Sequence, residues 1–434
     1  MAVLTPAEVD ALIAQLRRKL AGTPYACSSM ARLEGGTTSF VFRGVLAKSL
    51  AIRSDGGGSG IMGDGEEGRG VEVDGVIVKH AAGFAAVNKD VAIDSSRGVI
   101  EHEMLKAMAE FTSIALTLEV RTPRAYYIDA AATTHVLEDI RGASSLLSCI
   151  ETTSPMPLLR DNEAAVGLAL GSWLREFHRW TSAPGQRGLR EMIAGNPPMR
   201  KVKRSITYDA LMGIIEAHPG AVEHEGVKKV LAEVRDSLGG EFERSWDDAG
   251  SGNGDDGKVE DWGVIHGDFW TGNALLTNTS ALSPQALHNV YIIDWEFTQY
   301  GHRAYDLGQM IGDLCERHLL KEFSGMASLD GDSAALGIMR GFILGYGVLG
   351  EDMGFRTAIH AGVHLLCYCI RRDPGVTTPF DDEMGKMGTD LIVKGWKREK
   401  TWFQRSVFAC MFERGPPTSP VVNGPFRQRR FVRF

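Results

Sequence analysis

Val264-Ile265-His266-Gly267-Asp268-Phe269-Trp270-Thr271-Gly272-Asn273-Ala274-Leu275-Leu276 decides the fold, together with Val290-Tyr291-Ile292-Ile293-Asp294-Trp295-Glu296. Two apolar runs of strand length, residues 274–276 and 290–293, are joined by a polar segment. This pattern predicts an antiparallel hairpin. Asn273 precedes its first strand and Asp294 follows its second, so both are expected at the same open end. Asp268 is expected in the loop beside them.

These three side chains offer only oxygen ligands. Two carboxylates and one amide suit a hard cation that keeps some of its waters, and Mg²⁺ on the phosphates of a nucleotide is the common case. Zinc would favour nitrogen or sulfur ligands. The alternative is that Asp, Asn and Gly serve only as turn residues. A turn does not require this ordered set at both ends of a hairpin, so we favour the metal site.

The order of these residues resembles a known family. His266-Gly267-Asp268, then Asn273, then Ile293-Asp294 at a strand end resemble the aminoglycoside phosphotransferase family of small-molecule kinases. The resemblance covers roughly residues 30–314. It implies that Asp268 orients the substrate hydroxyl and accepts its proton, and that Asn273 and Asp294 hold Mg²⁺. His266 is expected to brace the catalytic loop.

The resemblance also implies the fold class. We expect an α+β, two-lobed, protein-kinase-like chain, with a small antiparallel-sheet lobe followed by a larger, mainly helical lobe. A polar, glycine-containing turn near the amino terminus can place backbone N–H groups against phosphates. A plain hairpin turn explains the local pattern equally well, although the family has a similar turn. Its residues are Gly35, Gly36, Thr37, Thr38 and Ser39.

A lysine and a glutamate are expected to pair behind this turn. The run 76–79 predicts a strand whose valines face one side and Lys79 the other, where it can reach nucleotide phosphates. A helix is predicted over residues 97–111. Glu101 falls within its apolar stripe and Glu103 on the opposite side, so Glu101 is the expected partner of Lys79.

The lobe boundary is predicted near residue 140, where a strand over 134–140 passes into a connector. In the family the connector backbone binds the adenine edge, which implicates Glu138 and Ile140. The predicted domains are a nucleotide-binding lobe (1–140), a catalytic and substrate lobe (141–414) and a disordered tail (415–434). Residues 53–75 are rich in glycine and predict a flexible insertion, and residues 251–258 predict a second one.

Two polar residues of the second lobe have open interpretations. His178 adjoins a helical apolar stripe formed by Val166, Leu170, Trp173, Leu174 and Phe177, and a core histidine is favoured over a catalytic base. Asp306, in Tyr305-Asp306-Leu307-Gly308, resembles the family's aspartate that supports the catalytic loop. A helix-capping role explains Asp306 equally well.

Composition narrows the class of protein. The chain has 434 residues and a formal charge of −8, which argues against broad binding to nucleic acid or to anionic membranes. Its six cysteines form no Cys-x-x-Cys pair, so no zinc knuckle or disulfide framework is indicated. No secretion signal or membrane-spanning run is recognised. We therefore expect a cytoplasmic protein.

The sequence thus predicts an ATP- and Mg²⁺-dependent kinase acting on the hydroxyl group of a small molecule. The acceptor class stays open among aminoglycoside-, sugar- and amino-alcohol-like compounds, and Glu296-Phe297 with Tyr300-Gly301 faintly resembles methylthioribose kinase. Three rivals remain: a nucleotide-binding pseudokinase, a metal-dependent hydrolase and a protein kinase. Trp295 and Glu296 stand where protein kinases have Phe-Gly, so an activation switch of that kind is not assumed.

Overall fold

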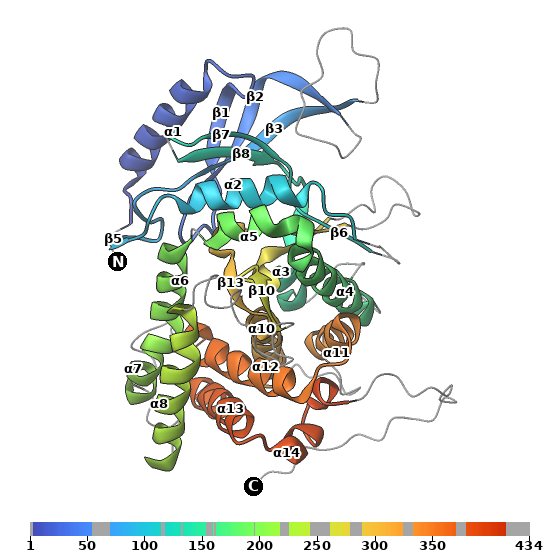
Figure 1. Ribbon diagram of the computed structural model, residues 1–434. Helices are drawn as coiled ribbons and strands as arrows, with labels where there is room; N and C mark the ends of the chain where they lie inside the picture. Colours follow the sequence, from blue (N-terminus) through green and yellow to red (C-terminus); the bar gives the residue numbers. More distant parts are fainter. Residues whose placement is uncertain are drawn as a thin grey trace.

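The chain forms two lobes in the computed structural model, with a sheet and two helices above and a larger helical body below (Figure 1). The structure describes residues 3–53, 70–113, 118–131, 133–152, 159, 162–194, 196–217, 225–243, 261–277, 289–323, 333–369 and 379–413. The insertion at 251–258, the tail at 415–434 and residues 54–69 of the first insertion lie outside the described residues. The predicted two-lobed α+β architecture, of the protein-kinase-like kind, is confirmed.

A five-stranded antiparallel sheet forms the first lobe, in the order β1-β2-β3-β8-β7. Helix α1 (Pro6–Leu20) covers it and begins with a capping box, in which Thr5 and Glu8 bond each other's backbone N–H groups. The strands are β1 (Cys27–Arg32), β2 (Phe40–Arg53), β3 (Gly70–His80), β7 (Ala125–Asp129) and β8 (Thr134–Glu138). A small hairpin of β4 (Phe84–Ala85) and β5 (Asn88–Ala92) follows β3.

The predicted boundaries of the first insertion were wrong at both ends. Arg53 ends β2, and residues 70–75 belong to β3, where Val73 pairs with Leu50 and Gly75 with Val45. The reason is visible in residues 71–74, where valines alternate with acidic residues in the period of a strand. The surrounding glycines hid this alternation.

Helix α2 (Arg97–Met108) lies between the sheet and the second lobe, next to α5 (Arg187–Ala194) in Figure 1. It buries Ile100, Glu101, Met104 and Met108. A charged side chain buried on this face requires a partner, which points to Lys79 of β3.

The predicted hairpin is confirmed. Strands β11 (Ala274–Thr277) and β12 (Asn289–Ile292) pair antiparallel, with Ala274 opposite Ile292. Strand β9 (Ala143–Ser145) extends the sheet on one side and β6 (Glu119–Arg121) on the other. A second ribbon joins β10 (Trp262–Ile265) to β13 (Gln299–His302) and delivers the chain into the His266-Gly267-Asp268 loop.

Helices supply most of the second lobe. Helices α4 (Glu163–Ser182) and α11 (Ala334–Tyr346) approach so closely that a Cβ atom on Gly171 would lie 1.9 Å from the Phe342 carbonyl oxygen. Small residues therefore set this helix contact. The other helices are α3 (Leu146–Glu151), α6 (Pro197–Arg204), α7 (Ala210–Ala217), α8 (Glu225–Gly240), α10 (Ala304–Phe323), α12 (Glu351–His364), α13 (Pro379–Trp396) and α14 (Lys400–Gln404).

An aromatic cluster from α4 packs against the loop that carries His266, Gly267 and Asp268. Trp173 stacks on both Phe177 and Phe269, and Trp295 packs edge-on against Phe177. Phe269 and Trp295 flank the polar loop residues in sequence, so this apolar core fixes the two loops that follow β10 and β12. No helix in the described ranges is long and apolar enough to span a bilayer.

Candidate active site

The loop after β10 has a backbone that only glycine fits well. Gly267 has φ of +78°, and a Cβ atom there would lie 2.2 Å from the carbonyl oxygen of Phe297. A larger residue at position 267 would push this loop away from the segment that follows Asp294.

His266 braces the loop, as expected. Its ring is fully buried, its Nδ1 accepts the N–H of Asp268 at 3.2 Å, and its Nε2 lies 3.1 Å from the Ile293 carbonyl oxygen. These partners require a neutral ring protonated on Nε2. Burial lowers the pKa of His266 and keeps it neutral. The histidine thereby ties the loop after β10 to the end of the β11–β12 ribbon.

Asp306, in the first turn of α10, supports the same loop. Its carboxylate accepts the backbone N–H groups of His266 at 2.8 Å and Gly267 at 2.9 Å. His178 Nε2 lies 3.2 Å from it, and His178 Nδ1 lies 3.0 Å from the Tyr346 hydroxyl. Of the two interpretations of Asp306, the contacts favour loop support. His178 is a buried, partnered core histidine, which was the favoured interpretation.

Asn273 and Asp294 lie together at the open end of the ribbon, as the hairpin predicts. The N–H of Ile293 donates to the Asn273 carbonyl at 3.0 Å, which holds the two strand ends side by side. Asn273 Nδ2 donates to the backbone and the side-chain oxygens of Asp268, each at 2.9 Å. This bonding orients the amide and leaves its Oδ1 as the atom suited to a cation.

Asp294 occupies a left-handed backbone conformation, with φ of 64°. Such a conformation is costly for residues other than glycine, and aspartate is among the few that tolerate it. Its side chain is 40% exposed, while that of the next residue, Trp295, is buried. Because an amide and a carboxylate oxygen are ligands that Mg²⁺ prefers, Asn273 and Asp294 fit that ion. Within the described residues, no group of three or more His, Cys, Asp or Glu side chains is arranged to hold a metal.

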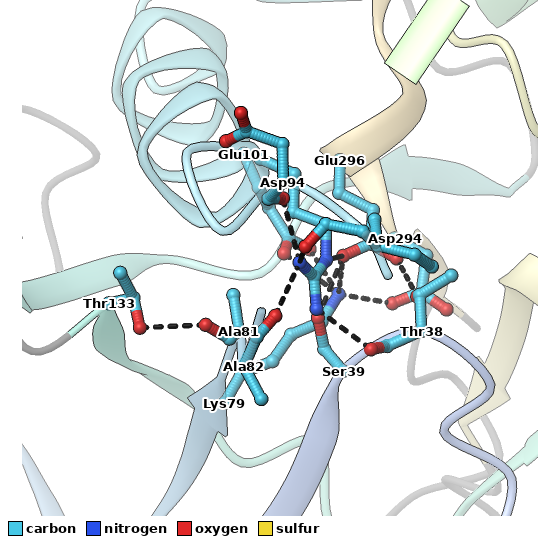
Figure 2. Close-up of polar contacts among 12 residues, drawn as sticks. Thr38, Ser39, Lys79, Ala81, Ala82, Asp94, Glu101, Thr133, Asp294 and Glu296 are labelled. Carbon is cyan, nitrogen blue, oxygen red and sulfur yellow. Dashed lines mark hydrogen bonds and ion pairs between the residues drawn. The ribbon is translucent and has the colours of Figure 1, made fainter. Parts of the chain in front are cut away.

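Lys79 faces this end of the ribbon from β3. Its Nζ lies 2.8 Å from the Glu101 carboxylate and 2.7 Å from Asp294 Oδ1 (Figure 2). Burial alone would lower the pKa of Lys79, but the charges of Asp294 and Glu101 raise it above its ordinary value. The predicted choice of Glu101 is confirmed. Glu103 instead lies near Lys106 at the surface.

A second cluster links the polar turn to the ribbon. Glu296 accepts the hydroxyl groups of Thr38 and of Ser39, the latter at 2.9 Å (Figure 2). It also lies 3.4 Å from Arg97 Nε. Arg97 donates in turn to the Thr38 carbonyl at 2.8 Å. Gly35, with φ of +101°, and Gly36, where a Cβ atom would lie 2.4 Å from the Ser39 carbonyl oxygen, shape the turn. Thr37 accepts the N–H of Val87 at 3.2 Å. The turn is thus fastened to the second lobe.

Some backbone groups of the connector, which the sequence analysis assigned to binding of the adenine edge, already have hydrogen-bond partners in the protein. The N–H of Glu138 donates to the Arg124 carbonyl at 2.9 Å, and the Glu138 side chain accepts the N–H of Arg124 at 3.1 Å. The Ile140 carbonyl already accepts the N–H of Ala143 at 3.4 Å.

Comparison with known proteins identifies the family. Residues 99–341 match the model of the phosphotransferase enzyme family that includes the aminoglycoside phosphotransferases. The chain belongs to this family. The match contains Glu101, Asp268, Asn273 and Asp294. It begins after Lys79.

Relatives of this phosphotransferase include other kinases. It is 28% identical to the phosphotransferase FrzJ of Cladobotryum sp over 94% of this chain and 98% of the relative. It is 24% identical to the 4-hydroxytryptamine kinase of Psilocybe cubensis, over 55% of this chain and 59% of the relative. A solved choline kinase of Cryptosporidium parvum Iowa II aligns over 93% of this chain and 100% of its own, with 9% identity and a TM-score of 0.47.

Sequence reasoning missed several residues of the phosphotransferase site, and Lys203 is one of them. Lys203 of α6 lies 2.5 Å from Asp268 Oδ1 and is almost completely buried. Burial alone would lower the pKa of Lys203, but the charge of Asp268 raises it. Lys203 lies in a run of basic residues on a short helix, far from Asp268 in the sequence. Nothing in the sequence of that run distinguishes it from the exposed Lys201 or from the partly buried Arg200 and Arg204.

Proposed function

We propose that this phosphotransferase moves the γ-phosphoryl group of ATP, bound with Mg²⁺, to a hydroxyl group of a small molecule. One observation carries the proposal: Asn273 holds Asp268 on one side of the ribbon end while Asp294, on the other side, meets Lys79 at 2.7 Å. A proton acceptor, two oxygen ligands and a phosphate-binding cation are thereby gathered at one place. Phosphoryl transfer depends mainly on such positioning.

The first lobe supplies the nucleotide contacts in this proposal. Lys79, held by Glu101, binds the phosphates, and the backbone of residues 35–39 covers them. The Glu138 carbonyl and the Ile140 N–H bind the adenine edge. The contacts of Glu296 with Thr38 and Ser39 support this role, because they hold the turn over the ribbon end where the phosphates would lie.

Asn273 Oδ1 and the Asp294 carboxylate would hold the magnesium ion. Bound there, Mg²⁺ supplies positive charge that offsets the charge of the phosphates. Lys79 already lies beside Asp294 and would turn toward the phosphates when the carboxylate takes up its ligand role. The hydrogen bonds from Asn273 to Asp268 hold the proposed metal ligand and the proposed proton acceptor at a fixed distance from each other.

Asp268 would receive the acceptor. Its carboxylate orients the hydroxyl oxygen toward the γ-phosphorus and takes the hydroxyl proton as the new phosphorus–oxygen bond forms. The bond between the γ-phosphorus and the bridging oxygen breaks, and its electron pair leaves with ADP. The acceptor class is aminoglycoside-, sugar- or amino-alcohol-like. Relatives named as 4-hydroxytryptamine kinases make hydroxylated amines the first compounds to test. A cytoplasmic location stays a prediction.

A phosphorylation assay tests the proposal. The protein is incubated with Mg²⁺, ATP and single acceptors, namely 4-hydroxytryptamine, choline, ethanolamine, an aminoglycoside and methylthioribose, and the phosphorylated product is measured by mass spectrometry. We expect one acceptor class to be phosphorylated by the wild type and the Asp268→Asn variant to be at least ~10²-fold slower. Equal rates would refute the role of Asp268. Thermal stabilisation by Mg²⁺ and ATP without any transfer would indicate a pseudokinase instead.

A further inference from the structure

A buried lysine touches the carboxylate proposed to receive the acceptor. Lys203 reaches Asp268 from α6, and its side chain is 1% exposed. Its ammonium also lies 4.5 Å from the centre of the Phe297 ring and 5.3 Å from that of Tyr368. The buried ammonium of Lys203 therefore contacts two aromatic rings and one carboxylate in place of water. Burying it is costly, so its position needs a reason.

Support of Asp268 does not by itself require a cation. The Asp268 carboxylate also accepts Asn273 Nδ2 at 2.9 Å, Trp270 Nε1 at 3.3 Å and Gln309 Nε2 at 3.4 Å. These three donors are neutral. Two of them are also fixed by a second bond: the amide of Asn273 bonds the Asp268 backbone, and Gln309 Oε1 accepts the N–H of Phe269 at 3.2 Å. Lys203 differs because its ammonium carries charge and ends a flexible chain.

The other two buried cations of the site serve the opposite side. Lys79 lies between Glu101 and Asp294, and Arg97 lies against Glu296. Both therefore face the nucleotide side, where carboxylates of the ribbon and of α2 offset them. Lys203 lies beside the atom that would hold the acceptor hydroxyl. Lys203 Nζ lies 2.5 Å from Asp268 Oδ1. An acceptor hydroxyl that is hydrogen-bonded to the same carboxylate would therefore lie within a few ångströms of the ammonium.

We propose that Lys203 is a further catalytic residue, whose ammonium offsets the charge of the phosphoryl group as it passes from ADP to the acceptor oxygen. This inference rests on the proposed function. The hydroxyl of an entering acceptor must donate a hydrogen bond to a carboxylate oxygen of Asp268. Lys203 is the donor that can release Asp268 Oδ1 and bond the phosphoryl oxygens instead. The acceptor proton goes to Asp268, the electron pair of the broken bond leaves with ADP, and Lys203 keeps its proton throughout.

Affinity for a phosphoryl mimic tests Lys203 without knowing the acceptor. Binding of ADP with Mg²⁺ is measured by calorimetry with and without aluminium fluoride, which mimics the phosphoryl group in transit. The wild type should bind more tightly with fluoride. In Lys203→Met, the ratio of the affinities with and without fluoride should be about 10²-fold smaller than in the wild type, while the affinity for ADP with Mg²⁺ is unchanged. Lys201→Met is the matched control, because Lys201 is exposed on the same helix. It should behave as the wild type.

The possible outcomes separate the two proposals. A Lys203→Met protein with the full fluoride gain overturns this inference alone. A wild type that binds no ADP with Mg²⁺ overturns the proposed function and this inference with it, and a wild type that gains nothing from fluoride overturns this inference.

The Asp268→Asn variant separates a direct role of Lys203 from one through Asp268. It should keep the gain from fluoride, because it removes a negative charge. Equal loss of the gain in Asp268→Asn and Lys203→Met would mean that Lys203 acts only by holding Asp268. If Lys203→Met does not fold, Lys203→Gln takes its place with the same expectation.

Discussion

Lys79 Nζ of the first lobe lies 2.7 Å from Asp294 Oδ1 of the second, so one ion pair joins the sheet to the ribbon end. Glu101 holds the other side of the ammonium at 2.8 Å. The three residues come from β3, the ribbon and α2, and no two of them are neighbours in the sequence. In the proposed function, their meeting defines the nucleotide side of the site.

Glu101→Gln should weaken this arrangement. The amide removes the negative charge that fixes Lys79, while Glu101 also accepts the N–H of Trp295 at 3.3 Å. We expect the unfolding free energy to fall by about 3 kcal/mol, the cost of breaking a buried pair. The affinity for a non-hydrolysable ATP analogue should also fall. Urea unfolding and calorimetry measure these two quantities. Glu103→Gln, on the exposed side of the same helix, is the control, and equal effects of the two changes would contradict the assignment.

Glu296→Ala should release the polar turn. The change removes the acceptor of the Thr38 and Ser39 hydroxyl groups and leaves the Arg97 guanidinium buried without this carboxylate. Hydrogen exchange of the backbone amides in residues 35–39 should become faster, and the thermal midpoint should fall. Glu34→Ala changes an exposed carboxylate beside the same turn and should leave exchange unaltered. Unchanged protection in the Glu296 variant would show that the turn is held by other contacts.

Gly171→Ala should destabilise the second lobe. The new methyl group would meet the backbone of α11, where its carbon would lie 1.9 Å from the Phe342 carbonyl oxygen, and the two helices must separate. We expect a loss of roughly 2 kcal/mol in unfolding free energy, in the range typical of overpacked cores. Gly213→Ala in α7 is the matched change, because no atom lies within 4 Å of the added carbon. That variant should gain about 0.5–1 kcal/mol from helix propensity.

His360 should make stability depend on pH. Burial, with a smaller effect of Arg356, lowers the pKa of His360 to about 3, and its Nδ1 lies 2.5 Å from the Tyr208 hydroxyl. The unfolded histidine titrates near its ordinary pKa of about 6.5. Its contribution to stability is therefore full above about pH 6.5 and is lost as the pH falls toward about 3. Unfolding free energies of the wild type and His360→Gln, measured from pH 7 to 4, should converge on acidification. Parallel curves would contradict this.

The local patterns of the sequence were sufficient for several elements. The capping box of Thr5 and Glu8 at the start of α1 is a pattern of this local kind, because the contacts of a helix start lie within a few residues. The β11–β12 ribbon followed from two apolar runs with polar ends. Helical periodicity alone separated Glu101 from Glu103, since only one of them could lie on the buried face.

Long-range contacts could not be predicted in this way. Lys203 lies in a run of basic residues, and only the fold of α6 against the catalytic loop shows which of them is buried. Glu296 was noticed as a departure from Phe-Gly, yet its bonds to Thr38 and Ser39 join opposite lobes. The start of β3 was hidden because glycine density masked an alternating pattern. Each of these features depends on a partner far away in the chain.

Binding of an ATP analogue as a function of Mg²⁺ tests the central claim most directly. That claim is that Asn273 and Asp294 hold the ion on the nucleotide phosphates opposite Lys79. Calorimetric titration of the wild type should show at least ~10-fold tighter binding with Mg²⁺ than without it, and Asp294→Asn should abolish this gain while the variant stays folded. A wild type indifferent to Mg²⁺, or an Asp294→Asn variant that keeps the full gain, would contradict the account.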